Sequence, residues 1–388
     1  MRKQALFALV MAALMLNACG RSDPPPPTPV QVNPSPTIAD VAPPDPAVTT
    51  APPPTSMPAL STPTEPPSSV IPENLQPISG ENLDLLEPIY ELPFISIHSP
   101  AFSPDNRYMS MGLGGRSGVE RWGTLVFDLT TEQEVLWLED EYPQLQFAPD
   151  SASIFLMEGA TLTEFDLVSG QETVLYDGEQ TCAALSPDAR RLAVLQVTGL
   201  DNKESTITII DVQTGQETPL DPIDVGLHAD QFQFSPDGRV LVAIYGFLSD
   251  SVSGVNFMIW DAFSGELRGV IPSYEALALD PRGGYLAATI YHRGYLSIIS
   301  LDSLELVRYF GPGSGYLYRR PQYTSDGSMI FVNDDGVLRF FDPDSGEELG
   351  VVDLSYRIGW SAMSADRTLL AAGDSNYPGG VTLWAVQP

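Results

Sequence analysis

Most of the chain after residue 81 repeats one short turn motif, and this repeat limits the possible folds more than any other feature. Each copy is an apolar run that ends in a Ser-Pro-Asp-like turn, as in Phe234-Ser235-Pro236-Asp237-Gly238. The seven turns are centred on positions 105, 150, 188, 237, 282, 326 and 366, so successive copies lie 38 to 49 residues apart. That period is typical of a four-stranded blade. The copy Asp280-Pro281-Arg282 is degraded.

A second motif follows each turn roughly 25 residues later. It is an apolar run that ends in Asp, with Ser or Thr and then Gly soon after, as in Ile259-Trp260-Asp261 and in Asp166 to Gly170. Proline presets φ, Asp accepts hydrogen bonds from nearby backbone N–H groups, and Gly takes a positive φ. Because the same residue recurs at the same turn, we interpret these aspartates as structural caps rather than as a carboxylate array.

The motifs, with Phe234–Gly238 and Ile259–Asp261 as the best copies, resemble those of WD-repeat and related bacterial β-propeller proteins. The resemblance extends over residues 81–388 and implies an all-β, seven-bladed β-propeller. Most copies lack the Trp-Asp pair, and none has a convincing Gly-His before its first strand. The resemblance therefore implies an architecture and no particular cellular role.

The number of strands predicts how the ring closes. The last repeat supplies only three strand-like segments, Trp360–Ser364, Leu369–Ala372 and Val381–Val386. A spare apolar segment, Leu85–Leu92, precedes the first turn. We expect this N-terminal strand to complete the last blade, because closure removes exposed sheet edges.

The first 80 residues are unlike the repeats. Residues 1–18 combine a basic start, an apolar run and a small residue before Cys19, which predicts a lipoprotein signal peptide with Cys19 as the lipidated residue. Residues 19–80 hold most of the 36 prolines and predict a disordered Pro/Ser/Thr-rich stalk. For residues 1–19 the alternatives are an ordinary signal peptide with a chance cysteine and a frayed anchor helix. For the stalk the alternative is a proline-rich ligand for a recognition module. We expect an extracytoplasmic protein, lipid-anchored to a bacterial cell envelope membrane.

Composition and missing motifs exclude several functions. With 50 acidic and 19 basic side chains the net charge is −31, which argues against a nucleic-acid partner. Two cysteines exclude a disulfide scaffold and a multi-cysteine metal site, and Cys182 lies in an apolar run that predicts a buried thiol. No nucleophile elbow, zinc-protease motif or phosphate loop occurs. We therefore expect no catalytic residue, no cofactor and no metal site. Binding of a calcium ion by acidic residues around a central channel remains an alternative.

Candidate ligand-binding residues lie in the long connections, which alternating strand direction places on one face of the ring. Arginine and aromatic residues gather there within a domain of 45 acidic and 16 basic side chains. Such residues suit protein interfaces and sugar or anion recognition. The candidates are Arg116, Arg121, Trp122, His292, Arg293, Tyr316, Tyr318, Arg319, Arg320, Arg357 and Tyr377, with Arg319-Arg320 as the favoured patch. Alternatively, these arginines bind neighbouring loop carbonyls and acids while the aromatics fill the rim.

The sequence thus predicts a monomeric propeller that acts as a binding module or scaffold for a protein, peptide or glycan through this long-loop face. One alternative is a hydrolase or lyase with an acidic, calcium-dependent channel site. Another is a structural component of an envelope assembly, similar to the Tol-system propeller.

Overall fold

A computed structural model describes residues 71–388 apart from 93–96, 114–121, 140–143, 159–160, 179–181, 199–203, 222–228, 247–254, 275, 290–294, 312–317, 335 and 375–379. The side chains of some strand residues beside these gaps, including that of Cys182, are also outside the description. The described residues 71–388 belong to one compact unit. The predicted signal peptide, Cys19 and most of the predicted stalk therefore lie outside the described residues. Among the described residues, no helix is long and apolar enough to cross a membrane.

Twenty-eight strands of the described residues form seven antiparallel sheets of four strands, which we call blades 1 to 7. Blade 1 consists of β2 (Ile97–Phe102), β3 (Tyr108–Leu113), β4 (Gly123–Asp128) and β5 (Gln133–Glu139), and blade 2 of β6 (Gln144–Phe147), β7 (Ser153–Glu158), β8 (Thr161–Asp166) and β9 (Glu172–Asp177). Blade 3 consists of β10 (Cys182–Leu185), β11 (Arg191–Thr198), β12 (Glu204–Asp211) and β13 (Glu217–Pro219). Blade 4 consists of β14 (Ala229–Phe234), β15 (Val240–Gly246), β16 (Val255–Asp261) and β17 (Leu267–Tyr274). Blade 5 consists of β18 (Ala276–Leu279), β19 (Tyr285–Thr289), β20 (Leu296–Ser300) and β21 (Leu306–Phe310). Blade 6 consists of β22 (Tyr318–Tyr323), β23 (Ile330–Asp334), β24 (Val337–Phe341) and β25 (Glu348–Asp353). Blade 7 consists of β26 (Ile358–Met363), β27 (Leu370–Asp374), β28 (Val381–Ala385) and β1 (Glu87–Leu92). A single-turn 3-10 helix, η1 (Leu83–Leu85), precedes β1.

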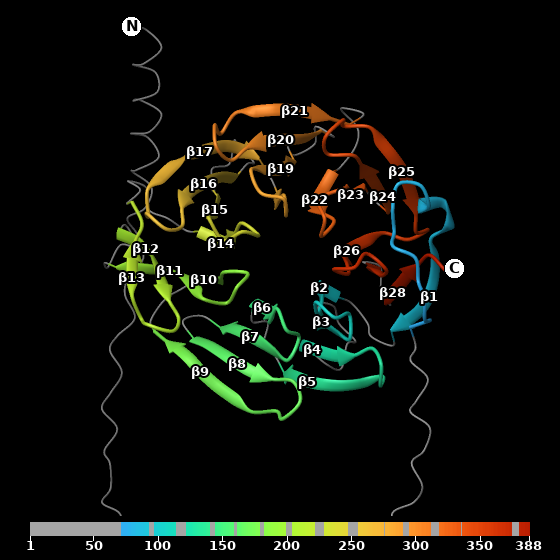
Figure 1. Cartoon of the computed structure of the whole chain (residues 1–388), viewed down its shortest axis with the longest axis horizontal. Helices are drawn as coiled ribbons and strands as arrows, with labels where there is room; N and C mark the ends of the chain where they lie inside the picture. Colours follow the sequence, from blue (N-terminus) through green and yellow to red (C-terminus); the bar gives the residue numbers. More distant parts are fainter. Residues whose placement is uncertain are drawn as a thin grey trace, which may run out of the picture. The chain divides into compact units, whose positions relative to one another are not determined.

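The first strand of each blade lies near the centre of the ring and the last strand lies at its rim (Figure 1). Some neighbouring first strands contact one another directly, as β10 does β14 and β18 does β22. The same contact joins β2 of blade 1 to β26 of blade 7, so the ring is continuous. The predicted all-β, seven-bladed β-propeller is confirmed.

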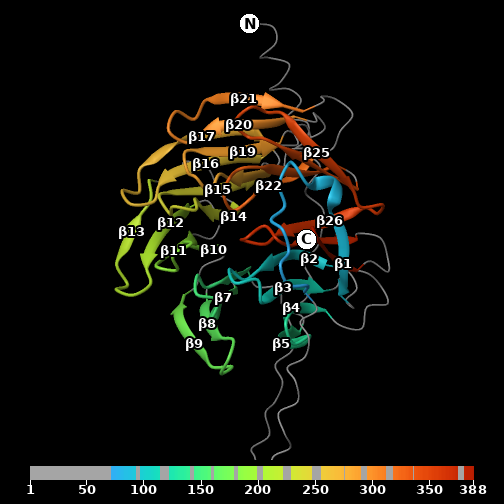
Figure 2. The same ribbon diagram turned by 45° about the vertical axis from the view of Figure 1, so that its right-hand side comes forward.

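The N-terminal strand closes the last blade as predicted. β1 pairs antiparallel with β28, with Leu92 opposite Val381 and Glu87 opposite Ala385. It therefore becomes the outer strand of blade 7, and Figures 1 and 2 show it in blue beside the red C-terminal strands. The two ends of the repeat region hold each other in one sheet.

Contacts with the ring begin before residue 81, within the range that the sequence assigned to the stalk. Gln76 forms an isolated β-bridge with Val386, and the Ile78 N–H donates to the Arg367 carbonyl at 2.8 Å. Ile78 is fully buried between blades 6 and 7 together with Leu83. Burial of such a side chain is worth about 1.5–3 kcal/mol, so the last residues of the proline-rich region contribute to the ring.

The apolar core lies between blades rather than at the centre of the ring. Seven clusters of buried residues each join two neighbouring blades. The cluster between blades 3 and 4 includes Trp260, which is fully buried and donates its indole N–H to the Asp221 carbonyl at 3.3 Å. Because each sheet buries apolar residues on both sides, the blades hold one another in place and the turns at their ends are fixed.

Candidate functional site

The ring has two faces with different connections. The turn face carries the turns between first and second strands and between third and fourth strands, such as residues 235–239 and 262–266 of blade 4. The loop face carries the connections between second and third strands and between blades. Several of these are long, such as residues 114–122 between β3 and β4.

The structure describes the side chains of three candidate residues: Trp122, Arg320 and Arg357. For Tyr318 and Arg319 it describes only the backbone, at the start of β22. The other candidates lie outside the described residues: Arg116, Arg121, His292, Arg293, Tyr316 and Tyr377.

Arg320 joins blade 6 to blade 7 at the inner part of the ring. Its guanidinium lies over the indole ring of Trp360, and its Nη1 donates to the carbonyl oxygen of Gly359. Arg320 sits at a β-bulge in β22 with φ +50°, a conformation that costs a residue with a Cβ about 1–2 kcal/mol. The cation–π contact offsets part of this cost. This contact agrees with the alternative that the arginines of the long connections bind neighbouring loops. A role of Arg320 in ligand binding stays a prediction.

Arg357 and Trp122 are exposed on the loop face. Arg357 precedes β26, so it lies three residues before the indole that Arg320 covers. Its neighbour Tyr356 donates its hydroxyl to the Ala372 carbonyl at 3.4 Å and accepts from the Trp384 indole N–H at 3.4 Å. Trp122 stands just before β4, with 39% of its surface exposed. The structure therefore brings Arg320 and Arg357 to the boundary of blades 6 and 7 and places Trp122 on blade 1.

On the turn face the repeated aspartates are used by the turns themselves. In blade 4, the Ser235 hydroxyl donates to the Asp237 carboxylate at 2.6 Å and accepts the Val240 N–H at 2.9 Å. The same Asp237 oxygen accepts the Arg239 N–H at 3.0 Å. The same pattern recurs at Ser103–Asp105, Ser186–Asp188, Thr324–Asp326 and Ser364–Asp366. The expectation that these residues are structural caps is confirmed.

The second turn of most blades is capped in the same way. Asp261 accepts the N–H groups of Phe263 and Ser264, both at 3.0 Å, and Asp128, Asp166, Asp211 and Asp342 act alike. The Arg268 guanidinium at 2.6 Å and the Ser264 N–H lower the pKa of Asp261 to about 2. Within the described residues, no three His, Cys, Asp or Glu side chains gather in a way that could hold a metal ion.

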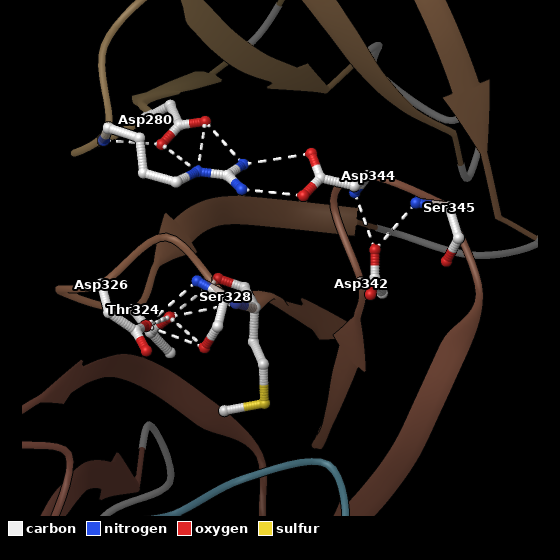
Figure 3. A network of polar contacts seen from close by, with 9 residues as sticks. Asp280, Thr324, Asp326, Ser328, Asp342, Asp344 and Ser345 are labelled. Carbon is white, nitrogen blue, oxygen red and sulfur yellow. Dashed lines mark hydrogen bonds and ion pairs between the residues drawn. The ribbon is translucent and has the colours of Figure 1, made fainter.

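Blade 5 departs from this pattern. Asp280 replaces the serine of the first turn and Arg282 replaces the aspartate, with Asp280 almost fully buried. The Arg282 guanidinium donates to Asp280 at 2.9 Å and to Asp344 of blade 6 at 2.8 Å, and these two carboxylates raise its pKa. Figure 3 shows Asp280 and Asp344 beside the regular Thr324–Asp326 turn of blade 6. An ion-pair bridge between two blades thus replaces a hydroxyl–carboxylate cap within one blade.

Two hollows flank Arg282. One, of about 370 Å³ between blades 4 and 5, is lined by Asp237, Arg239 and Arg268, each paired with an opposite charge. The other, of about 40 Å³ between blades 5 and 6, is lined by Tyr323 and Arg308 among others; we call it the blade 5–6 cavity. Sequence reasoning missed this cavity. The available signal was that Arg282, Arg308 and Tyr323 each break the repeat.

Comparisons with known proteins support the architecture alone. No protein-family model and no curated protein sequence matches the chain. Among solved structures, the β-propeller domain of Cps50 (Swd1) from Myceliophteria thermophila is similar with a TM-score of 0.58 and 14% identity, covering 78% of this chain and 100% of that domain. Since 1408 solved chains match, the likeness identifies a widely shared fold and no single function.

Proposed function

We propose that this protein is an extracytoplasmic binding protein, anchored by a lipid on Cys19, whose propeller holds a protein, peptide or glycan partner through the loop face. The propeller acts as a rigid, monomeric scaffold, and residues 19–70 hold it away from the membrane.

The difference between the two faces carries this proposal. On the turn face the polar groups of the regular turns are consumed by caps, as at Ser235 and Asp237. On the loop face several connections are longer, such as residues 114–122 and 247–254, and Trp122 and Arg357 are exposed beside a rigid sheet edge. Exposed tryptophan and arginine on loops that a rigid scaffold supports are typical of binding surfaces.

The test is crosslinking on intact cells, comparing the wild type with the double variant Trp122→Ser/Arg357→Glu. Arg320 is left unchanged because it joins blades 6 and 7. The matched control is Phe263→Ser/Arg190→Glu, which removes an exposed aromatic and an exposed arginine from the turn face. We expect the loop-face variant to lose at least 10-fold of the crosslinked partner while the control keeps it, with both melting within a few degrees of the wild type. Equal capture by both variants would overturn the placement.

The anchor has its own test. Cys19→Ser should release the protein from the membrane fraction and abolish incorporation of a labelled fatty acid, because one residue carries the lipid. A Cys182→Ser variant is the control and should remain membrane-bound. Retention of the Cys19→Ser protein in the membrane would contradict a lipid anchor at this residue.

A further inference from the structure

The repeat supplies an internal reference for each position, and three residues that depart from it meet in the blade 5–6 cavity. Arg282 takes the place of the turn aspartate. Tyr323 takes a place that holds Phe, Leu or Met in the other blades, as at Phe234 and Leu279. Arg308 stands four residues after the positive-φ residue of the second turn, and the matching positions are Leu136, Val174, Pro219, Gly269 and Gly350. All three line the same cavity although they come from two blades.

The cavity holds more hydrogen-bond donors than the protein satisfies. The Tyr323 hydroxyl is buried and has no hydrogen-bond partner among the described residues, and burial raises its pKa. Arg308 is half-buried, and its side chain forms no ion pair or hydrogen bond with any described residue. The nearby carboxylates of Asp280 and Asp344 are held by Arg282. Arg308 can only donate and the Tyr323 hydroxyl can donate as well as accept, so the two groups together suit an acceptor such as a carboxylate, which a guanidinium binds in a bidentate manner.

The outer strand beside the cavity is also unusual. β21 contributes Val307 and Arg308 to the cavity, and no described strand pairs with its outer edge. Leu306, Val307 and Tyr309 are 52%, 45% and 63% exposed. Each of the other six outer strands contains a carboxylate or a proline, whereas β21 contains neither. Carboxylates and prolines protect edge strands from pairing, and the one charge of β21, Arg308, lines the cavity and can attract an acidic segment. We therefore take β21 as the outer edge most open to an added acidic strand.

We propose that the blade 5–6 cavity binds the carboxylate of an aspartate or glutamate carried by an extended peptide segment of a partner protein, which lies along β21. Arg308 and the Tyr323 hydroxyl hold the carboxylate. Arg282, fixed by Asp280 and Asp344, forms the wall. The cavity volume of about 40 Å³ admits one such group, since a water molecule needs roughly 10–15 Å³ by the same kind of measure. This site lies on the turn face and does not depend on the loop-face proposal.

The experiment selects from a displayed library of random octapeptides on the full-length protein. Peptides retained by the wild type are expected to share one Asp or Glu next to alternating apolar residues. For the best peptide, changing that acid to its amide should weaken binding by about 10-fold or more on the wild type, as expected for a charge-assisted hydrogen bond. On Arg308→Leu and Tyr323→Phe, which restore residues found in other blades, the same change should matter less than about 2-fold.

Arg190→Leu, an exposed turn-face arginine on blade 3, is the matched control and should keep the full preference for the acidic peptide. The proposal is overturned if no peptide is enriched over the starting library, or if the acid preference survives in Arg308→Leu. It is also overturned if a galacturonate oligosaccharide binds in an Arg308-dependent manner while no acidic peptide does, because the partner is then a glycan. The proposal is likewise overturned if the protein self-associates through this edge in sedimentation experiments, because the partner is then a second copy of the chain.

Discussion

Blades 4 and 5 are neighbours with the same four-stranded arrangement, yet different side chains close the turns at their turn-face ends. In blade 4 the first turn is closed by a neutral hydroxyl and a carboxylate, Ser235 and Asp237, within the blade. In blade 5 a buried carboxylate and a guanidinium, Asp280 and Arg282, take these places, and the guanidinium also reaches Asp344 of blade 6. The second turns differ too, because Asp261 of blade 4 is matched by Ser300 in blade 5.

The difference separates what the fold requires from what it tolerates. The cap of blade 4 satisfies backbone N–H groups locally, and its partly exposed carboxylate keeps contact with water, so the desolvation cost is small. An ion pair with one buried member costs desolvation and is often no more stable than a neutral replacement. Blade 5 therefore gains little stability from the charges of Asp280 and Arg282. Their departure from the repeat is better explained by the polar groups that blade 5 presents at the blade 5–6 cavity.

The largest difference between the blades should come from removing one partner of each turn. Arg282→Ala leaves Asp280 buried without its counter-charge and should lower the free energy of unfolding by about 3–5 kcal/mol. Asp237→Ala, in the regular turn, removes hydrogen bonds from a partly exposed carboxylate and should cost about 1 kcal/mol. Urea unfolding of both variants at pH 7 measures the difference. Equal losses would show that the two turns are energetically alike.

The second turns should differ in their response to pH. The pKa of Asp261 is lowered to about 2 in the folded protein, so its contribution is complete above the pKa of the unfolded chain, near 4, and is lost as the pH falls towards 2. Asp261→Asn should therefore cost about 2 kcal/mol at pH 7 and progressively less below pH 4. Ser300→Ala in blade 5 should cost under about 1 kcal/mol with no pH dependence, because its hydroxyl accepts only weak bonds, at 3.3 and 3.2 Å. Urea unfolding at pH 7, 4 and 2.5 checks this, and a constant loss for Asp261→Asn would contradict the assignment.

The smallest effects are expected at the positive-φ position of the second turn. Glycine occupies it in blade 4 at Gly265, whereas Glu132 of blade 1 and Leu304 of blade 5 adopt φ +56° and +59°. Glu132→Gly should stabilise the protein by about 0.5–1 kcal/mol, since Glu132 is exposed. Leu304→Gly should destabilise it by a similar amount or more, because Leu304 packs over Gly269 and on the core between blades 4 and 5. A stabilising Leu304→Gly in thermal melts would show that the packing of Leu304 is unimportant.

The sequence predicted the features that repeat, and the structure confirms them: seven blades, capped turns and closure by the strand that contains Leu92. These features depend on local turn and strand chemistry that recurs along the chain, so each copy of the motif supports the same prediction. It did not predict that Ile78 would be buried, because one apolar side chain in a proline-rich context has no local pattern. It also could not predict that Arg308 and Tyr323 meet, since that contact depends on the packing of two blades. Arg282 was visible as a broken turn, but its link to Asp344 was not.

The most direct test of the central claim, that the departures between blades 5 and 6 serve a ligand rather than the fold, is the unfolding free energy of Tyr323→Phe. Phenylalanine occupies this position in blade 4 at Phe234, and the Tyr323 hydroxyl is buried without a hydrogen-bond partner in the part of the chain that the structure describes. We expect that the free energy of unfolding in urea stays unchanged or rises by up to about 1 kcal/mol, because an unsatisfied buried hydroxyl is removed. A loss of more than about 1 kcal/mol would contradict it, since the hydroxyl would then be part of what holds the blades together.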